Sequence, residues 1–335
     1  MKLDFALTEG TLRSAREDGR RAGDAGFSRV WTTETTADPF LQALSAAQAG
    51  APEIGTGIAV AFARTPMVTA YAAWDLAAIT EGRFVLGLGS QVKGHIERRY
   101  GMPWGQPAAR MRDYIDALRA IWHSWGTGDP LAYEGPFYRH SLMTPVFTPE
   151  RHDHRIPIGI AAVGNLMTEL AGESADLLLV HGFSNAAYID AVTLPAVQRG
   201  LERARRTRAD IELYSSTFLL MGDTEEEQAR MREQARERIA FYGSTPSYLP
   251  VLDAIGRADV SERLQERARA KDWDGLAALV DDDVLDAFAL TGTPEEMPGL
   301  VKERFGGRLD RVASYYGWPA MEPGRLRDIV AAFHA

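Results

Sequence analysis

The chain has 335 residues, 45% of them hydrophobic and 25% charged, as in ordinary globular proteins that bury a large core. A net charge of −9 argues against nucleic acid as a partner, because affinity for nucleic acid depends on clustered lysine and arginine. The absence of cysteine excludes disulfides, a thiolate nucleophile and Cys-ligated metals. No apolar run approaches the ~20 residues of a membrane span, and the N-terminal residues lack the hydrophobic segment of a signal peptide, so we expect a soluble, cytoplasmic protein that does not enter a membrane.

Eight segments have the composition of β-strands. Two of them lie at the ends of a unit that spans residues 54–97, and both are continuous runs of small and branched apolar residues without alternation. Strands of this kind are covered on both faces and are usually parallel. In chain order, the other six are residues 3–7, 29–34, 156–163, 176–180, 211–221 and 311–316.

Helical patterns follow nearly every strand. Asp38 and Pro39 have the character of an N-cap and a first helical position. Thr224 precedes an acidic first turn, which also favours a helix start. The predicted helices are residues 11–25, 39–49, 68–83, 107–122, 166–174, 186–206, 224–242 and 323–333. Strands that alternate with helices predict an α/β fold of the (β/α)8 TIM-barrel type, with an open doubly wound sheet as the alternative.

Two stretches interrupt this alternation. Residues 125–155 mix glycine, proline, aromatic residues and histidine, and residues 131–138 are compatible with a short hairpin. Residues 243–308 are mostly helical and lack a clear strand. We therefore expect residues 1–335 to form a single barrel domain, with one insertion before the fifth strand and another between the seventh and the eighth.

Glycine-rich turns end two neighbouring strands of the predicted barrel. Residues 87–91 (GLGSQ) end the fourth strand, and residues 161–165 (AAVGN) end the fifth. Glycine lets a ligand approach main-chain N–H groups, and the start of a helix favours anions. Because active sites of such barrels lie at the C-terminal ends of the strands, two such turns on one rim suggest a phosphorylated ligand. The alternative is that both are simply short barrel loops.

Three titratable residues are candidates for acid–base catalysis. His181 and Glu34 follow predicted strands, and His95 lies a turn inside a helix. Histidine titrates near neutral pH, but a hydrogen-bonded structural role is the alternative for each of these residues. We expect no metal site, because His152 and His154 lie together in an insertion without a third ligand nearby.

Three motifs together resemble the bacterial luciferase-like monooxygenase superfamily, and more narrowly its deazaflavin (coenzyme F420)-dependent oxidoreductases. They are GIAVAFARTP at residues 57–66, GRFVLGLGS at 82–90 and AGESAD at 171–176. Their joint order and spacing are specific, and the resemblance covers most of the chain. It implies a TIM barrel, hydride transfer between coenzyme F420 and a small organic substrate, and a homodimer. An FMN-dependent monooxygenase that uses oxygen and a non-catalytic flavin- or deazaflavin-binding barrel are the alternatives.

The resemblance also implies a set of site residues. In the family, a non-proline cis peptide in the third strand supports the central ring of the cofactor, and here it matches Gly57–Ile58. The turns after the fourth and fifth strands take the cofactor's tail and phosphate in relatives. The implied cofactor-binding residues are Glu34, Thr35, Gly57, Ile58, Ala59, Gly89, Ser90, Gln91, Ala161, Ala162, Val163, Gly164, Asn165, His181 and Gly182.

The chain departs from the family pattern at two positions. Thr35 or Thr36 replaces a histidine that several relatives have after the second strand. Gln91 stands where the sugar-phosphate dehydrogenases of the family have a glutamate, which argues against that substrate class. The proton donor is therefore open, with Glu34, His95 and His181 as the candidates.

Overall fold

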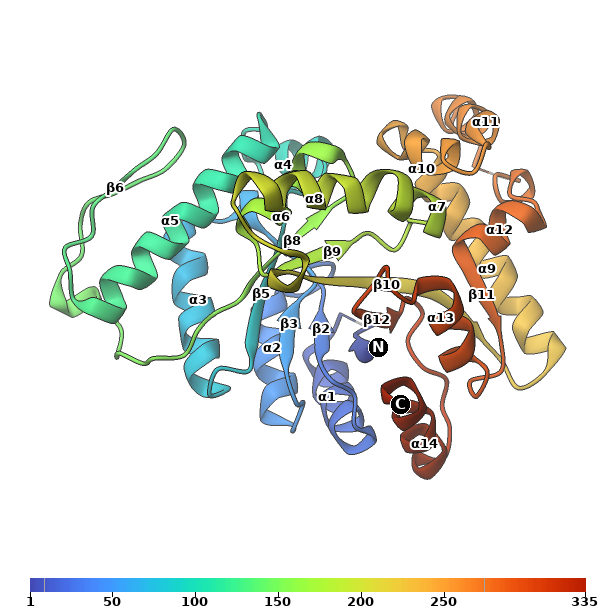
Figure 1. The fold of residues 1–335 in the computed structure, drawn as a ribbon, viewed down its shortest axis with the longest axis horizontal. Coiled ribbons are helices and arrows are strands. Elements are labelled where there is room, and N and C mark those ends of the chain that lie inside the picture. Colours follow the sequence, from blue (N-terminus) through green and yellow to red (C-terminus); the bar gives the residue numbers. More distant parts are fainter. Residues whose placement is uncertain (9, 274) are drawn as a thin grey trace.

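The computed structural model describes residues 1–8, 10–273 and 275–335. Within these residues, eight parallel strands close into a barrel (Figure 1), which confirms the predicted (β/α)8 fold. The barrel strands are β1 (Lys2–Ala6), β2 (Val30–Thr32), β3 (Ile54–Thr56), β5 (Phe84–Gly89), β8 (Ile158–Ala162), β9 (Leu177–Val180), β10 (Glu212–Met221) and β12 (Arg311–Ser314). The ring closes because β10 pairs with both β9 and β12, and β12 pairs with β1.

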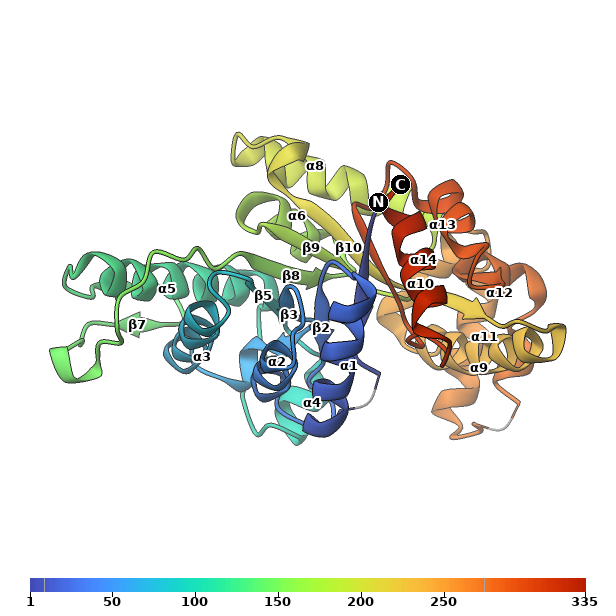
Figure 2. The same ribbon diagram turned by 90° about the horizontal axis from the view of Figure 1, so that it is seen from below.

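Helices surround the strands on the outside, as both ribbon views show (Figures 1 and 2). Thr11, Asp38 and Thr224 cap the first, second and ninth helices by accepting hydrogen bonds from backbone N–H groups of the first turn. The helices are α1 (Leu12–Ala25), α2 (Pro39–Gln48), α3 (Pro66–Ile79), α4 (Lys93–Arg98), α5 (Pro107–Thr127), α6 (Asn165–Ser174), α7 (Ala186–Tyr188), α8 (Leu194–Arg203), α9 (Glu225–Gly243), α10 (Leu249–Asp253), α11 (Ala258–Arg269), α12 (Asp282–Phe288), α13 (Met297–Phe305) and α14 (Pro323–His334).

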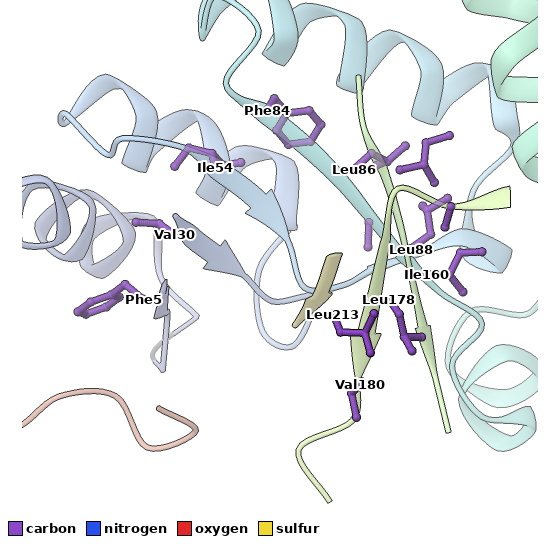
Figure 3. Close-up of a cluster of buried hydrophobic side chains, with 14 of the residues drawn as sticks. Phe5, Val30, Ile54, Phe84, Leu86, Leu88, Ile160, Leu178, Val180 and Leu213 are labelled. Atoms are coloured by element: carbon purple, nitrogen blue, oxygen red, sulfur yellow. The ribbon is translucent and has the colours of Figure 1, made fainter. Parts of the chain in front are cut away.

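Neighbouring residues of a barrel strand belong to two different cores. Val30 and Leu178 lie in the layer between strands and helices (Figure 3). Trp31 and Leu179, one residue further on, belong to a second cluster inside the barrel. Side chains alternate between the two faces of a strand, so both faces here need apolar residues. For this reason the sequences of the strands are continuous apolar runs.

The predicted insertions contain short strands of their own. Before β8, β6 (Tyr133–Glu134) and β7 (Arg139–His140) form an antiparallel hairpin. After β10, β11 (Ala289–Gly292) pairs in parallel with the outer end of β10, so the prediction that residues 243–308 lack a strand is wrong. β11 is only four residues long and depends on a distant partner, which local sequence patterns do not reveal.

The predicted helix over residues 186–206 is also discontinuous. A π-helical turn, Ile189–Thr193, separates α7 from α8. Pro195 lies in the first turn of α8 and has no N–H to continue the usual helical hydrogen bonding. The helix is therefore interrupted where the proline removes a donor.

A buried ion pair lies within the barrel at β1 and β12. Asp4 and Arg311 are at most 1% exposed, and Arg311 donates two hydrogen bonds, Nε to Asp4 Oδ2 at 2.9 Å and Nη2 to Asp4 Oδ1 at 2.8 Å. The Trp31 indole N–H donates to the same carboxylate at 2.8 Å. The carboxylate thus links β1, β2 and β12 with charge-assisted hydrogen bonds.

We expect Asp4→Asn to destabilise the fold by about 3–5 kcal/mol, because it removes the buried carboxylate that accepts two hydrogen bonds from Arg311 and leaves that charge with only the longer contacts to Glu53 at 3.6 Å and Glu212 at 3.5 Å. Lys2→Met is the control, since it removes the solvent-exposed Lys2–Glu212 pair at 3.1 Å and should change stability by less than about 1 kcal/mol. Urea unfolding measures both. Equal stability of the two variants would contradict a dominant role for the buried pair.

Candidate active site

The C-terminal ends of adjacent strands lie at the same level of the barrel. β4 (Ala59–Val60) continues the third barrel strand and places Val60 opposite Gly89 of β5. Further round, Ala162 of β8 lies opposite Val180 of β9, and Val180 lies opposite Ser215 of β10. The loops that follow these strands therefore share one rim, which is where barrel enzymes carry their chemistry.

A break in the third strand lies on this rim. β3 ends at Thr56, β4 begins at Ala59, and the peptide bond between Gly57 and Ile58 is cis, as the family resemblance predicted. The Thr56 hydroxyl donates to the Gly87 carbonyl at 2.7 Å and accepts from the Gly87 N–H at 2.9 Å. These two bonds attach the break directly to β5.

Glycine allows β5 to approach the break this closely. A Cβ atom on Gly87 would lie 1.9 Å from the Thr56 carbonyl oxygen, and one on Gly89 would lie 2.7 Å from Ile58 Cδ1. Ile58 and Ala161 are only partly buried and pack on the cluster inside the barrel. Two small residues, Gly89 and Ala161, thus pack near the partly exposed Ile58 at the mouth of the barrel.

Glu34 follows β2 and is fully engaged in this arrangement. Its Oε2 accepts from the Val60 N–H at 2.7 Å and from Arg64 Nη1 at 2.6 Å, and its Oε1 accepts from the Tyr100 hydroxyl at 2.9 Å. Arg64 also contacts Asp38 at 2.9 Å, and the Glu34 side chain is 7% exposed. Glu34 therefore holds β4 in place, and the geometry favours this positioning role over the predicted acid–base role.

The turn after β5 is closed by its own hydrogen bonds. Gln91 has the left-handed backbone conformation (φ 58°), and its side-chain oxygen accepts from the Val92 N–H at 3.0 Å. The Ser90 hydroxyl donates to the Gln91 carbonyl at 3.1 Å. On the next element, α4, the His95 ring is exposed and makes no hydrogen bond with the residues that the structure describes. The structure thus gives no support for acid–base catalysis by His95.

The turn between β8 and α6 leaves backbone donors available. Gly164 is the N-cap of α6, and no described side chain caps this helix. The space in front of Gly164 is open, since an added Cβ would meet nothing within 4 Å. Asn165 begins the helix, and the Tyr188 hydroxyl holds the turn by donating to the Val163 carbonyl at 3.0 Å. Free N–H groups at the start of a ten-residue helix suit an anion such as a phosphate.

His181 follows β9 and is held as a neutral imidazole. Its Nδ1 accepts from the Phe183 N–H at 3.0 Å, and its Nε2 lies 3.2 Å from the Tyr248 hydroxyl oxygen. A backbone N–H can only donate, so Nδ1 carries no hydrogen and Nε2 does. Burial lowers the pKa of His181 to about 4, which keeps the ring neutral at pH 7.

Tyrosine side chains cover the His181 side of the rim. Tyr242 and Tyr248 come from the segment around the end of α9, and Tyr315 follows β12. The Tyr242 and Tyr315 hydroxyls are 2.8 Å apart. Gly182 permits this packing, because a Cβ there would lie 3.3 Å from the Tyr315 ring and 2.4 Å from a backbone carbonyl of β10. Sequence reasoning missed Tyr315, although its place near the C-terminal end of the predicted eighth strand, residues 311–316, was a usable signal.

A cavity of about 780 Å³ lies at the other end of the barrel. Asp176 and Glu212 in its wall are at the N-terminal ends of β9 and β10, and Arg29 precedes β2. We therefore place the site by the strand ends and their chemistry, not by this cavity. In residues 1–8, 10–273 and 275–335, no cluster of three or more His, Asp and Glu side chains could hold a metal ion, and no helix is long and apolar enough to cross a membrane.

Stability should depend on the neutrality of His181. Because folding lowers the pKa of His181, its side chain binds a proton more readily in the unfolded chain than in the folded one between pH ~6.5 and ~4. The stabilisation that the neutral ring contributes to the folded state is therefore complete above pH ~6.5 and is lost on acidification. We expect wild type to lose about 2 kcal/mol more than His181→Asn between pH 7 and pH 4.5 in urea unfolding. His95→Asn, at an exposed ring, should behave as wild type. Identical pH profiles for all three proteins would contradict a buried, neutral His181.

A family model described as luciferase-like monooxygenase matches residues 4–310. A protein of Mycobacterium tuberculosis without an assigned function is 44% identical over 315 residues, covering 93% of this chain and 92% of that protein. The 5,10-methylenetetrahydromethanopterin reductase of Archaeoglobus fulgidus is 27% identical over 292 residues, covering 84% and 83%. The structure of the coenzyme F420-dependent tetrahydromethanopterin reductase from Methanopyrus kandleri matches with a TM-score of 0.78 and 21% identity, covering 98% and 96%. Because the family model matches residues 4–310, which is nearly the whole chain, the chain belongs to the luciferase-like monooxygenase family.

Proposed function

We propose that the protein is an oxidoreductase that transfers a hydride between coenzyme F420 and a small organic substrate. The observation that carries the proposal is the presence, on one rim, of a small-residue surface around Ile58 and an uncapped helix start at Gly164. A flat ring with an anionic tail needs both features. A protein of Mycobacterium tuberculosis named as a putative coenzyme F420-dependent oxidoreductase, 27% identical to this chain over 292 residues, supports this choice within the family.

The residues present fit such a cofactor. Gly164 and the first N–H groups of α6 would hold a phosphate, and Ile58, Gly89 and Ala161 would lie against the ring. When bound, the deazaflavin would supply the hydride, while the protein contributes orientation and electrostatics. We propose as contacts the set implied by the family resemblance, with Glu34 as a positioning residue that acts through Val60.

The surroundings of the site are part of the proposal. The barrel would act as one domain, with the segment after α9 covering the rim through Tyr242 and Tyr248. The homodimer and the cytoplasmic location stay predictions.

The cofactor can be tested by titrating the purified protein with coenzyme F420 and with FMN, each followed by its spectral change. We expect binding of coenzyme F420 and, with the reduced form, turnover of at least one member of a ketone, imine and enone panel. Tight FMN binding without coenzyme F420 binding would overturn the proposal. Oxygen uptake with reduced FMN would identify the monooxygenase alternative, and cofactor binding without any turnover would identify a non-catalytic barrel.

The phosphate position can be tested with Gly164→Asp. Gly164 has an ordinary φ of −77° and open space in front of it, so aspartate fits and should cap α6. Its carboxylate would occupy the N–H groups and repel a phosphate, and we expect coenzyme F420 to bind at least ~10-fold more weakly. Gly164→Ala is the matched control and should bind as wild type does. Equal affinity of the two variants would place the phosphate elsewhere.

A further inference from the structure

The hydrogen bond between His181 and Tyr248 has only one possible direction. Because the Phe183 N–H occupies Nδ1, the neutral His181 ring donates from Nε2, and the Tyr248 oxygen accepts at 3.2 Å. The phenolic hydrogen of Tyr248 therefore does not take part in the hydrogen bond with His181. Among the described residues, no other acceptor contacts this hydroxyl, and the side chain is half-buried.

The other tyrosines of the cluster are different. The Tyr316 hydroxyl donates to the Gln234 carbonyl at 3.2 Å, so its hydrogen is committed. The Tyr242 and Tyr315 hydroxyls bond to each other, and either can be the donor. Tyr248 is therefore the tyrosine of this group whose oxygen is held by the neutral His181 ring and whose own hydrogen is not donated to a described residue.

The pair lies on the part of the rim next to the strand that carries the proposed phosphate turn. His181 follows Val180, which pairs with Ala162 at the end of β8. Val163, the next residue along, packs on the same apolar cluster as Tyr248. The Tyr248 hydroxyl thus belongs to the part of the rim where the turn before α6 begins.

We propose that the phenolic O–H of Tyr248 donates a hydrogen bond to the acceptor atom of the substrate, a carbonyl oxygen or an imine nitrogen, and that His181 is the positioning residue that orients this hydroxyl. This inference rests on the proposed function, since it assigns the substrate side of the same site. It also names the substrate class: a compound with a hydrogen-bond acceptor next to an electrophilic carbon.

The physical basis is electrostatic preorganisation. When a hydride reaches the carbon, negative charge develops on the neighbouring oxygen or nitrogen, and a donor already fixed there stabilises it at no reorganisation cost. Burial raises the pKa of Tyr248 to about 12, so the phenol keeps its hydrogen at neutral pH. The His181 N–H polarises the Tyr248 oxygen and strengthens its donation.

The experiment uses 4-(dimethylamino)cinnamaldehyde, a chromophoric aldehyde whose absorption shifts to the red when its carbonyl oxygen accepts a strong hydrogen bond. The probe is added to protein loaded with oxidised coenzyme F420. We expect a red shift with wild type, its loss in Tyr248→Phe, and its retention in Tyr316→Phe, the matched control. Coenzyme F420 affinity should differ by less than ~2-fold among the three proteins.

A second measurement does not depend on any variant. Nitrogen NMR of the ¹⁵N-labelled histidines should show His181 with an unprotonated Nδ1 and a protonated Nε2 at pH 7. The opposite tautomer would overturn the role of His181, even if Tyr248→Phe failed to fold.

The outcomes separate this inference from the proposed function. Normal binding of coenzyme F420 by wild type without a probe shift, or with an equal shift in Tyr248→Phe, would overturn the role of Tyr248 and leave the cofactor proposal standing. Failure to bind coenzyme F420 would overturn the proposed function itself. A red shift lost in both tyrosine variants would show a general loss of packing and also contradict the specific role of Tyr248.

Discussion

The close contact between the third and fourth barrel strands is the constraint on which the rim depends. Thr56 bonds to both backbone groups of Gly87, and no side chain at Gly87 could be accommodated there. The chain can therefore leave the strand at Gly57 and rejoin it at Ala59 without separating from β5. The exposed part of Ile58, and with it the surface proposed for the cofactor ring, follows from this contact.

Charge is distributed differently at the two ends of the barrel. Asp4 and Arg311 form a buried pair, and Arg311 Nη1 also lies 3.5 Å from Glu212 at the start of β10. At the rim, the carboxylate of Glu34 is neutralised by Arg64. The groups proposed to meet a ligand are backbone N–H groups, a hydroxyl and a neutral imidazole. Such a surface can bind an anionic tail and polarise a neutral substrate without presenting a competing negative charge.

The family relationship and the geometry contribute different information. The relationship covers residues 4–310, and members of this family use a deazaflavin or FMN. It does not assign the proton-donating side of the site, because Gln91 departs from the pattern of the sugar-phosphate dehydrogenases and its side chain bonds to its own turn. The proposed hydrogen-bond donor to the substrate follows instead from the orientation of His181 and Tyr248.

Much of the architecture was predictable from local sequence. The apolar runs, the caps at Asp38 and Thr224 and the glycine-rich turns identified all eight barrel strands and most helices, because burial on both faces and helix starts leave short-range signals. The family motif also located the cis bond at Gly57–Ile58 correctly. These features depend on residues close together in the chain.

The roles of the polar side chains were decided only by the tertiary structure. Glu34 meets Arg64 and Tyr100, which are 30 and 66 positions away, and His181 meets Tyr248, 67 positions away. The strand β11 likewise exists only because the end of β10 supplies its hydrogen bonds. A side chain's protonation state and hydrogen-bond direction depend on the partners that folding brings to it, and a sequence pattern contains no record of those partners.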